Sequence, residues 1–166
     1  MRVTTLVLLR HAKAARPDDG PDFDRPLTTR GHGDAAAAGA WLRRKQYIPD
    51  VVLCSPARRT RQTWHAVAVA LADAARPEVT YRAEIYESGA PGVLALLHDL
   101  GEHAGTVLLV GHNPTVSDMS ALLAPAAVEE GGLRTSGIAV HRPRVPWARL
   151  GAGDAVLVEQ HTPRAG

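Results

Sequence analysis

The side chains of this chain that could do chemistry stand where apolar runs end. Three apolar runs each stop at a short polar cluster: Arg10-His11 after residues 3–9, Ser55 to Arg59 after 50–54, and Gly111-His112 after 106–110. An apolar run without charges is typical of a strand that is buried on both faces. The carboxyl ends of parallel strands share one edge of a sheet, where open α/β sheets bind ligands. We therefore expect these clusters to meet at one edge.

Two guanidinium and two imidazole groups at that edge would form a pocket for a tetrahedral dianion. Arg10 and Arg59 would hold phosphate oxygens in a planar fork and stay charged at any working pH. The sequence carries no serine elbow, no P-loop lysine and no context for a reactive cysteine. A neutral imidazole can attack phosphorus, so we interpret Arg10-His11 as the reacting centre. Taken alone, such a pair would be interpreted as solvated loop residues.

Strands and helices are expected to alternate along the chain. We predict strands at 3–9, 50–54, 77–81, 106–110, 135–141 and 155–161, and helices at 28–45, 56–75, 91–103 and 114–123. This alternation favours an α/β fold, a three-layer α/β/α sandwich with a mostly parallel central sheet. The two C-terminal strands would add mixed or antiparallel pairs. No linker interrupts the pattern, so residues 1–166 are predicted to form a single domain.

Helix termini show recognisable signals. Thr28 is a plausible N-cap for the first helix, and Ser55 is expected to cap the second with Pro56 at its first position. Gly31 and Gly33 fall in the first turns of a helix, where glycine costs about 1 kcal/mol relative to alanine. Glycine at such a place indicates that another group approaches the backbone closely. Residues 14–25 and 81–89 are predicted to be loops.

Composition excludes several classes of function. The chain is 45% hydrophobic and 22% charged with a formal net charge of +2, and no basic run is interleaved with aromatic residues, so we expect no nucleic-acid partner. No apolar run is long enough to span a bilayer, and we expect no membrane association. Cys54 is the only cysteine, which excludes an internal disulfide and a cysteine-based zinc cluster. The start, Met1-Arg2-Val3, does not resemble a signal peptide, so we expect a cytoplasmic protein.

Four motifs resemble those of the histidine phosphatase superfamily and follow in the same order. They are Leu9-Arg10-His11-Ala12, with alanine where the signature has glycine, then Arg25-Pro26-Leu27-Thr28-Thr29-Arg30-Gly31, Ser55-Pro56-Ala57-Arg58-Arg59-Thr60-Arg61-Gln62-Thr63 and Val110-Gly111-His112-Asn113-Pro114. The likeness covers nearly the whole length. It is closest to the short bacterial phosphohistidine phosphatases of the SixA type.

The resemblance implies a mechanism. His11 would attack the phosphoryl group and become a phosphohistidine, which water then hydrolyses. Arg10, Arg59 and His112 would hold the three phosphate oxygens, with His112 protonated and His11 neutral. No metal or cofactor is implied.

A general acid is expected only for some substrates. Family branches that act on phosphate esters carry a glutamate after the third strand to protonate the leaving oxygen. Glu84 occupies the corresponding region, with Glu87 as a competitor, and the alternative is that Glu84 is a solvated loop carboxylate. A P–N bond to imidazole makes less demand for an acid.

The substrate prediction is a phosphorylated protein that carries phosphohistidine. No long insertion separates the Gln62-Thr63 helix from His112, which favours an open site. The alternatives are a phosphatase of small phosphate esters or of phosphoserine and phosphothreonine, and a non-catalytic phosphate-binding module. The remaining histidines lack metal-ligand spacing and are interpreted as surface or core residues. They are His32, His65, His98, His103, His141 and His161.

Overall fold

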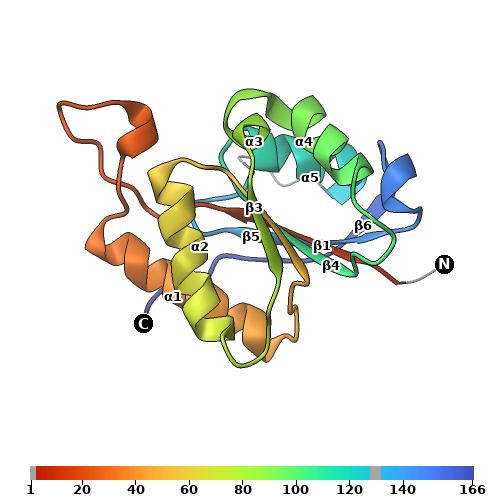
Figure 1. The fold of residues 1–166 in the computed structure, drawn as a ribbon, viewed down its shortest axis with the longest axis horizontal. Coiled ribbons are helices and arrows are strands. Elements are labelled where there is room, and N and C mark those ends of the chain that lie inside the picture. Colours follow the sequence, from red (N-terminus) through yellow and green to blue (C-terminus); the bar gives the residue numbers. More distant parts are fainter. Residues whose placement is uncertain (1–2, 128–131) are drawn as a thin grey trace.

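The computed structural model describes residues 3–127 and 132–166, and within them six strands form one mixed sheet (Figure 1). The strand order is β3-β2-β4-β1-β5-β6. The strands are β1 (Thr5–Arg10), β2 (Val51–Cys54), β3 (Glu78–Tyr81), β4 (Thr106–Gly111), β5 (Ile138–Pro143) and β6 (Ala155–His161). Neighbours among β3, β2, β4 and β1 are parallel, whereas β5 and β6 pair antiparallel. The predicted mostly parallel sheet with antiparallel C-terminal strands is confirmed.

Helices cover both faces of this sheet (Figure 1). Helices α1 and α2 pack together on one face, and α3, α4 and α5 lie on the other. Their bounds are α1 (Thr29–Arg44), α2 (Arg58–Leu71), α3 (Ala83–Glu87), α4 (Gly89–His98) and α5 (Thr115–Leu123), with short 3₁₀ turns at η1 (Asp22–Asp24), η2 (Pro125–Ala127) and η3 (Trp147–Arg149). The three-layer α/β/α architecture is therefore as predicted. Across the described residues, no helix is both long and apolar enough to cross a bilayer.

The apolar run at the start of the chain is explained by the two faces of β1. Leu6 and Leu8 point into the core formed with α4 and α5, and Val7 and Leu9 point into the core formed with α1 and α2. Successive side chains of a strand alternate between faces, so a strand covered on both sides must be apolar throughout. Val3 lies before the strand and is exposed, and β1 begins at Thr5.

The first helix begins as the sequence predicts. The Thr28 hydroxyl accepts a hydrogen bond from the Gly31 amide at 2.9 Å, which is an N-cap. Gly31 faces the backbone of Lys13, and a Cβ built on it would lie 2.1 Å from the Lys13 carbonyl oxygen. The expected close approach is therefore real. It holds the segment after His11 against the start of α1.

Three predicted boundaries are wrong. Ser55 does not cap the second helix: α2 begins at Arg58 after Ala57, and the Ser55 hydroxyl is engaged elsewhere. The predicted loop at 81–89 contains the short helix α3, because Ile85 is buried and anchors one helical turn. The third predicted helix ends at His98 rather than at 103.

The fifth strand starts later than expected. Ser136 has a positive φ of 63°, and the Gly137 amide bonds back to the Arg134 carbonyl, so a turn precedes β5 at Ile138. The sequence also predicts a solvated loop face at the acidic pair Glu129-Glu130, and this pair lies outside the described residues.

We expect Gly31→Ala to destabilise the protein by about 1–3 kcal/mol, because the added methyl group collides with backbone that cannot yield locally. Urea unfolding of both variants measures this. Gly33→Ala is the matched control, since its Cβ would meet only the Ala165 methyl group, at 3.1 Å. Equal losses in the two variants would contradict a close approach at Gly31.

Candidate active site

The backbone ladder of the parallel strands brings the two signature histidines together. Arg10 pairs with Gly111 at the last register position of β1 and β4, and the His11 amide donates to the Gly111 carbonyl at 3.0 Å. The imidazole rings of His11 and His112 lie 5.4 Å apart between centroids. On the next strand, the Ser55 amide donates to the Val110 carbonyl, also at 3.0 Å. The predicted convergence at one sheet edge is confirmed for these residues.

His11 is held as a neutral ring. Its Nδ1 lies 2.7 Å from the carbonyl oxygen of Ala12, which can only accept, so Nδ1 carries the proton. Burial, together with the charges of Arg59 and Arg10, lowers the pKa of His11 to about 4, although the bond to Ala12 opposes this shift. The Nε2 atom therefore keeps an unprotonated lone pair at neutral pH.

His112 is also neutral, because burial and the nearby Arg59 charge lower its pKa to about 3. The expectation that His112 is protonated concerns the site with phosphate oxygens beside it and stays a prediction. The protein's own groups favour the neutral ring, because they place positive charge beside a desolvated imidazole. Its Nε2 lies 2.7 Å from the Ser55 hydroxyl oxygen. That oxygen also accepts a hydrogen bond from the Ala57 amide at 3.3 Å. We assign the Ser55 hydroxyl proton to its contact with Nε2 of His112. The His112 proton is then on Nδ1.

Two arginines flank the rings. The Arg59 side chain is only 7% exposed, and its Nη atoms donate to the Asp22 carbonyl at 2.8 Å and to the Asp22 carboxylate at 3.1 Å. Arg10 donates from Nη1 to the Leu133 carbonyl at 3.1 Å. Burial lowers the pKa of Arg10. Both guanidinium groups belong to the residues that the sequence predicts for the site.

Three buried nitrogen atoms of this cluster have no hydrogen-bond partner in the described part of the chain. They are Nε of Arg10, Nε of Arg59 and Nδ1 of His112. A buried donor without an acceptor costs about 1–3 kcal/mol, so native proteins rarely leave several together. A ligand with several acceptor oxygens and negative charge would satisfy all three. This set of donors is thus suited to an oxyanion.

Helix α2 supports the loop that follows His11. The Thr63 hydroxyl accepts from the Ala12 amide at 3.1 Å, and the Gln62 side-chain oxygen accepts from the Leu27 amide at 2.8 Å. These two hydrogen bonds hold the two ends of the loop formed by residues 13–26 against α2. They give the Gln-Thr pair of the third motif a structural role.

Three residues of the site were missed by sequence reasoning. The sequence predicts Ser55 to be a helix cap, whereas its hydroxyl contacts His112. Asp22 and Tyr86 lie in the two segments that the sequence predicts to be loops, 14–25 and 81–89. The Tyr86 hydroxyl donates to the Asp22 carboxylate at 2.7 Å, and its ring meets the His112 ring edge-on at 5.5 Å. No local signal distinguishes them, because their roles depend on contacts across the fold.

The predicted acid candidates lie at the surface of α3. The Glu84 side chain is 40% exposed and forms an ion pair with Arg82 at 2.7 Å. A hydrogen bond from its own amide and the one from Arg82 lower the pKa of Glu84, whereas a general acid needs a raised pKa. Glu87 is exposed. The role of Glu84 stays a prediction, and from this helix it is Tyr86 that contacts the cluster.

The cluster holds no metal-binding arrangement: within residues 3–127 and 132–166, no three His, Cys, Asp or Glu side chains are grouped to hold an ion. Other histidines have structural partners. His141, for example, is fully buried, with its ring nitrogens bound to the Ser120 hydroxyl and the Ala155 carbonyl. His161 stacks on Trp41.

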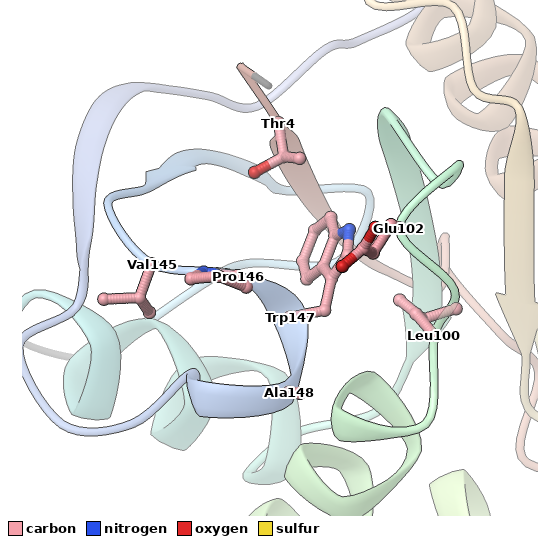
Figure 2. Close-up of a pocket in the computed structure, with 7 residues that line it drawn as sticks. All are labelled: Thr4, Leu100, Glu102, Val145, Pro146, Trp147 and Ala148. Atoms are coloured by element: carbon pink, nitrogen blue, oxygen red, sulfur yellow. The ribbon is translucent and has the colours of Figure 1, made fainter. Parts of the chain in front are cut away.

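A cavity of about 490 Å³ lies at the other end of β1 (Figure 2). Its lining residues are Thr4, Leu100, Glu102, Val145, Pro146, Trp147 and Ala148. None of the predicted site residues is among them. The reactive cluster and this cavity are therefore separate features, at opposite ends of the same strand.

Comparison with known proteins matches residues 6–90 to the family model "Histidine phosphatase superfamily (branch 1)". The chain is 42% identical to the uncharacterized protein Rv1276c of Mycobacterium tuberculosis over 165 residues, 94% of this chain and all of the relative. A proposed phosphohistidine phosphatase SixA from Nakamurella multipartitia has a similar structure, with a TM-score of 0.84 and 35% identity over 98% of each chain. The protein histidine phosphatase SixA in complex with tungstate gives 0.81 and 27% identity, over 96% of this chain and 97% of that one.

We expect both site histidines to remain neutral well below the pKa of an ordinary histidine, which is about 6.5. Burial and Arg59 disfavour the charged ring, so lowering the pH should protonate His11 only near 4 and His112 near 3. Titration of the ring ¹⁵N shifts by NMR measures this. A midpoint for either ring above about 6 would refute the desolvated cluster.

Proposed function

Because the chain belongs to the histidine phosphatase superfamily, we propose that it hydrolyses phosphohistidine on a protein through a covalent phosphoenzyme at His11. The observation that carries the proposal is the set of three buried, unpaired donors beside a neutral imidazole. Three donors match the three non-bridging oxygens of a phosphoryl group. The imidazole supplies the nucleophile.

In the first step the lone pair on Nε2 of His11 attacks phosphorus. The new N–P bond forms as the bond from phosphorus to the leaving group breaks. His11 keeps its Nδ1 proton on the Ala12 carbonyl, so its ring becomes positively charged and that carbonyl stabilises the charge. Arg10, Arg59 and His112 hold the oxygens while charge redistributes, which is an electrostatic and positioning role.

In the second step water attacks phosphorus and the N–P bond breaks. The bonding pair returns to Nε2 of His11, and both water protons leave with the product as dihydrogen phosphate. Ser55 keeps the Nδ1 proton of His112 available to a phosphate oxygen during both steps. A phosphoryl dianion bound between these groups would raise the pKa of His112 and oppose the lowering caused by burial and Arg59. It would therefore favour the protonated His112 ring that the family resemblance implies.

Protein-bound phosphohistidine is supported as the substrate by two observations. The similar structures that are at least 27% identical to this chain include SixA proteins, one of them a protein histidine phosphatase in complex with the oxyanion tungstate. Between β3 and β4 the chain adds only α3 and α4, with no further subdomain to close over the site. A small ester substrate is the alternative. We also propose that the protein acts in the cytoplasm, where a free thiol such as the buried Cys54 stays reduced.

We expect a labelled phosphodonor to leave an acid-labile phosphoryl group on the wild-type protein and none on His11→Ala, whose turnover should fall at least about a thousandfold. The rate of labelling should fall as the pH drops through about 4, because protonation of His11 removes the attacking lone pair. Rapid quenching followed by gel autoradiography measures both. His32→Ala, at an exposed position of α1, is the control.

A protein that neither turns over phosphohistidine nor forms a phosphoenzyme would instead be a phosphate-binding module. Tight binding of inorganic phosphate, measured by calorimetry, would identify that case.

Glu84→Gln separates the two substrate classes. If Glu84 protonates an ester leaving oxygen, the variant should lose about 100-fold on phenyl phosphate and far less on a histidine-phosphorylated peptide, whose imidazole needs no such acid. Steady-state kinetics on both substrates measures this, with Glu87→Gln as the comparison. An equal response of both substrates would remove Glu84 from the reaction.

A further inference from the structure

The carboxylate of Asp22 occupies an unusual position at the mouth of the site. It belongs to η1, yet it accepts hydrogen bonds from three side chains: Tyr86 at 2.7 Å, Arg59 at 3.1 Å and Arg25 at 3.1 Å. Its main-chain carbonyl binds Arg59 as well, at 2.8 Å. The loop after His11 is thereby fastened to α2 and α3 through a single aspartate.

This carboxylate lies close to the reacting groups. Tyr86 bridges it to His112, since the hydroxyl binds Asp22 and the ring edge meets the imidazole. Arg59, which binds Asp22, also acts on the charge of His11. The Asp22 side chain is nevertheless 52% exposed, so one side of it faces solvent. It is an anion on the outer rim of a pocket built for an anion.

Asp22 has one acceptor position left over. A carboxylate offers about four lone-pair positions. Oδ2 receives Tyr86 and Arg59, and Oδ1 receives Arg25. The remaining position is on Oδ1, and it can accept one further N–H or O–H group from a bound molecule.

We propose that Asp22 is a specificity-determining residue. It favours a leaving group that carries an N–H donor and positive charge, namely the imidazolium ring of phosphohistidine, over the leaving oxygen of a phosphate ester. This proposal rests on the proposed function, and it names the feature of the substrate that Asp22 recognises, the protonated ring of the leaving group. Negative charge beside the scissile bond favours a cationic leaving group and disfavours the anionic oxygen that an ester would release.

The chemistry balances without a separate acid. The substrate ring enters protonated on the nitrogen that does not carry phosphorus, with its N–H on Oδ1 of Asp22. Nε2 of His11 forms its bond to phosphorus, the substrate P–N bond breaks, and the bonding pair goes to the substrate ring. That ring leaves as neutral imidazole with its proton in place, and the positive charge now resides on the His11 ring.

Asp22 stays ionised in this arrangement. The hydrogen bond from Tyr86, followed by those from Arg25 and Arg59, holds the pKa of its carboxyl well below the usual range, although burial opposes this. The charged and titratable groups that face it are Arg25 on its own loop, Arg59 on α2, Tyr86 on α3 and His112 after β4. It therefore acts as a fixed acceptor and not as a proton donor.

Asp22→Asn tests the proposal, because it removes the charge and keeps the shape. The readout is the ratio of kcat/KM for a peptide phosphorylated on one histidine to kcat/KM for phenyl phosphate. We expect this ratio to fall about tenfold, the effect of one charge-assisted hydrogen bond. Asp22→Glu should restore part of it. Asp24→Asn, an equal charge change on an exposed residue of η1 whose side chain has no hydrogen bond within the described residues, should leave the ratio unchanged.

The pH dependence of kcat gives an independent readout. On phosphohistidine, kcat should fall as rising pH removes the proton of the bound substrate ring, and this falling limb should move to lower pH in Asp22→Asn, because a carboxylate stabilises the charged ring. Phenyl phosphate should show no such movement.

An equal loss on both substrates with an unmoved limb would mean that Asp22 only positions Arg59, and the proposal would be overturned. If the wild-type protein hydrolyses phenyl phosphate but not the phosphorylated peptide, the proposed function is refuted. That outcome is seen with the wild-type protein alone and does not depend on the Asp22 variants.

Discussion

Positive charge that is taken out of water must meet negative charge, and this constraint governs the carboxyl edge of the sheet. Arg59 is buried and Arg10 is half-buried beside two imidazoles, so both rings stay neutral and several donors find no acceptor among the described residues. Asp22 offsets part of the imbalance by holding Arg59. The remaining positive charge and unpaired donors are suited to a phosphoryl group, whose negative charge and oxygens would complete the cluster.

The main chain, more than the side chains, sets the position of the nucleophile. The His11 amide donates to Gly111 on β4, and its carbonyl accepts from the Ser136 amide before β5. The Ala12 amide is held by Thr63 of α2. With these contacts to three elements the His11 backbone has little freedom, which is the preorganisation that attack on phosphorus requires.

Much of this arrangement could be predicted from the sequence, because it follows from local patterns. Uncharged apolar runs fix the strands, and their ends place His11, Arg59 and His112 at one edge. What could not be predicted depends on contacts between distant segments. Asp22 resembles any turn aspartate until Arg59 and Tyr86 reach it across 37 and 64 residues. Ser55 carries a capping signal, yet the register of β2 and β4 turns its hydroxyl toward His112.

The strand that carries the nucleophile is the first of the chain but lies in the interior of the sheet. Its neighbours come much later: Thr5 pairs with Thr106, and Leu6 with His141. During synthesis, one edge of residues 5–10 must therefore wait for residues 106–111, and the other edge must wait for residues 138–141. Such distant pairing is slow to form, and the unpaired apolar segment is exposed meanwhile to other chains. The pairing with β4 that covers one edge of this segment is also the pairing that places His11 beside His112.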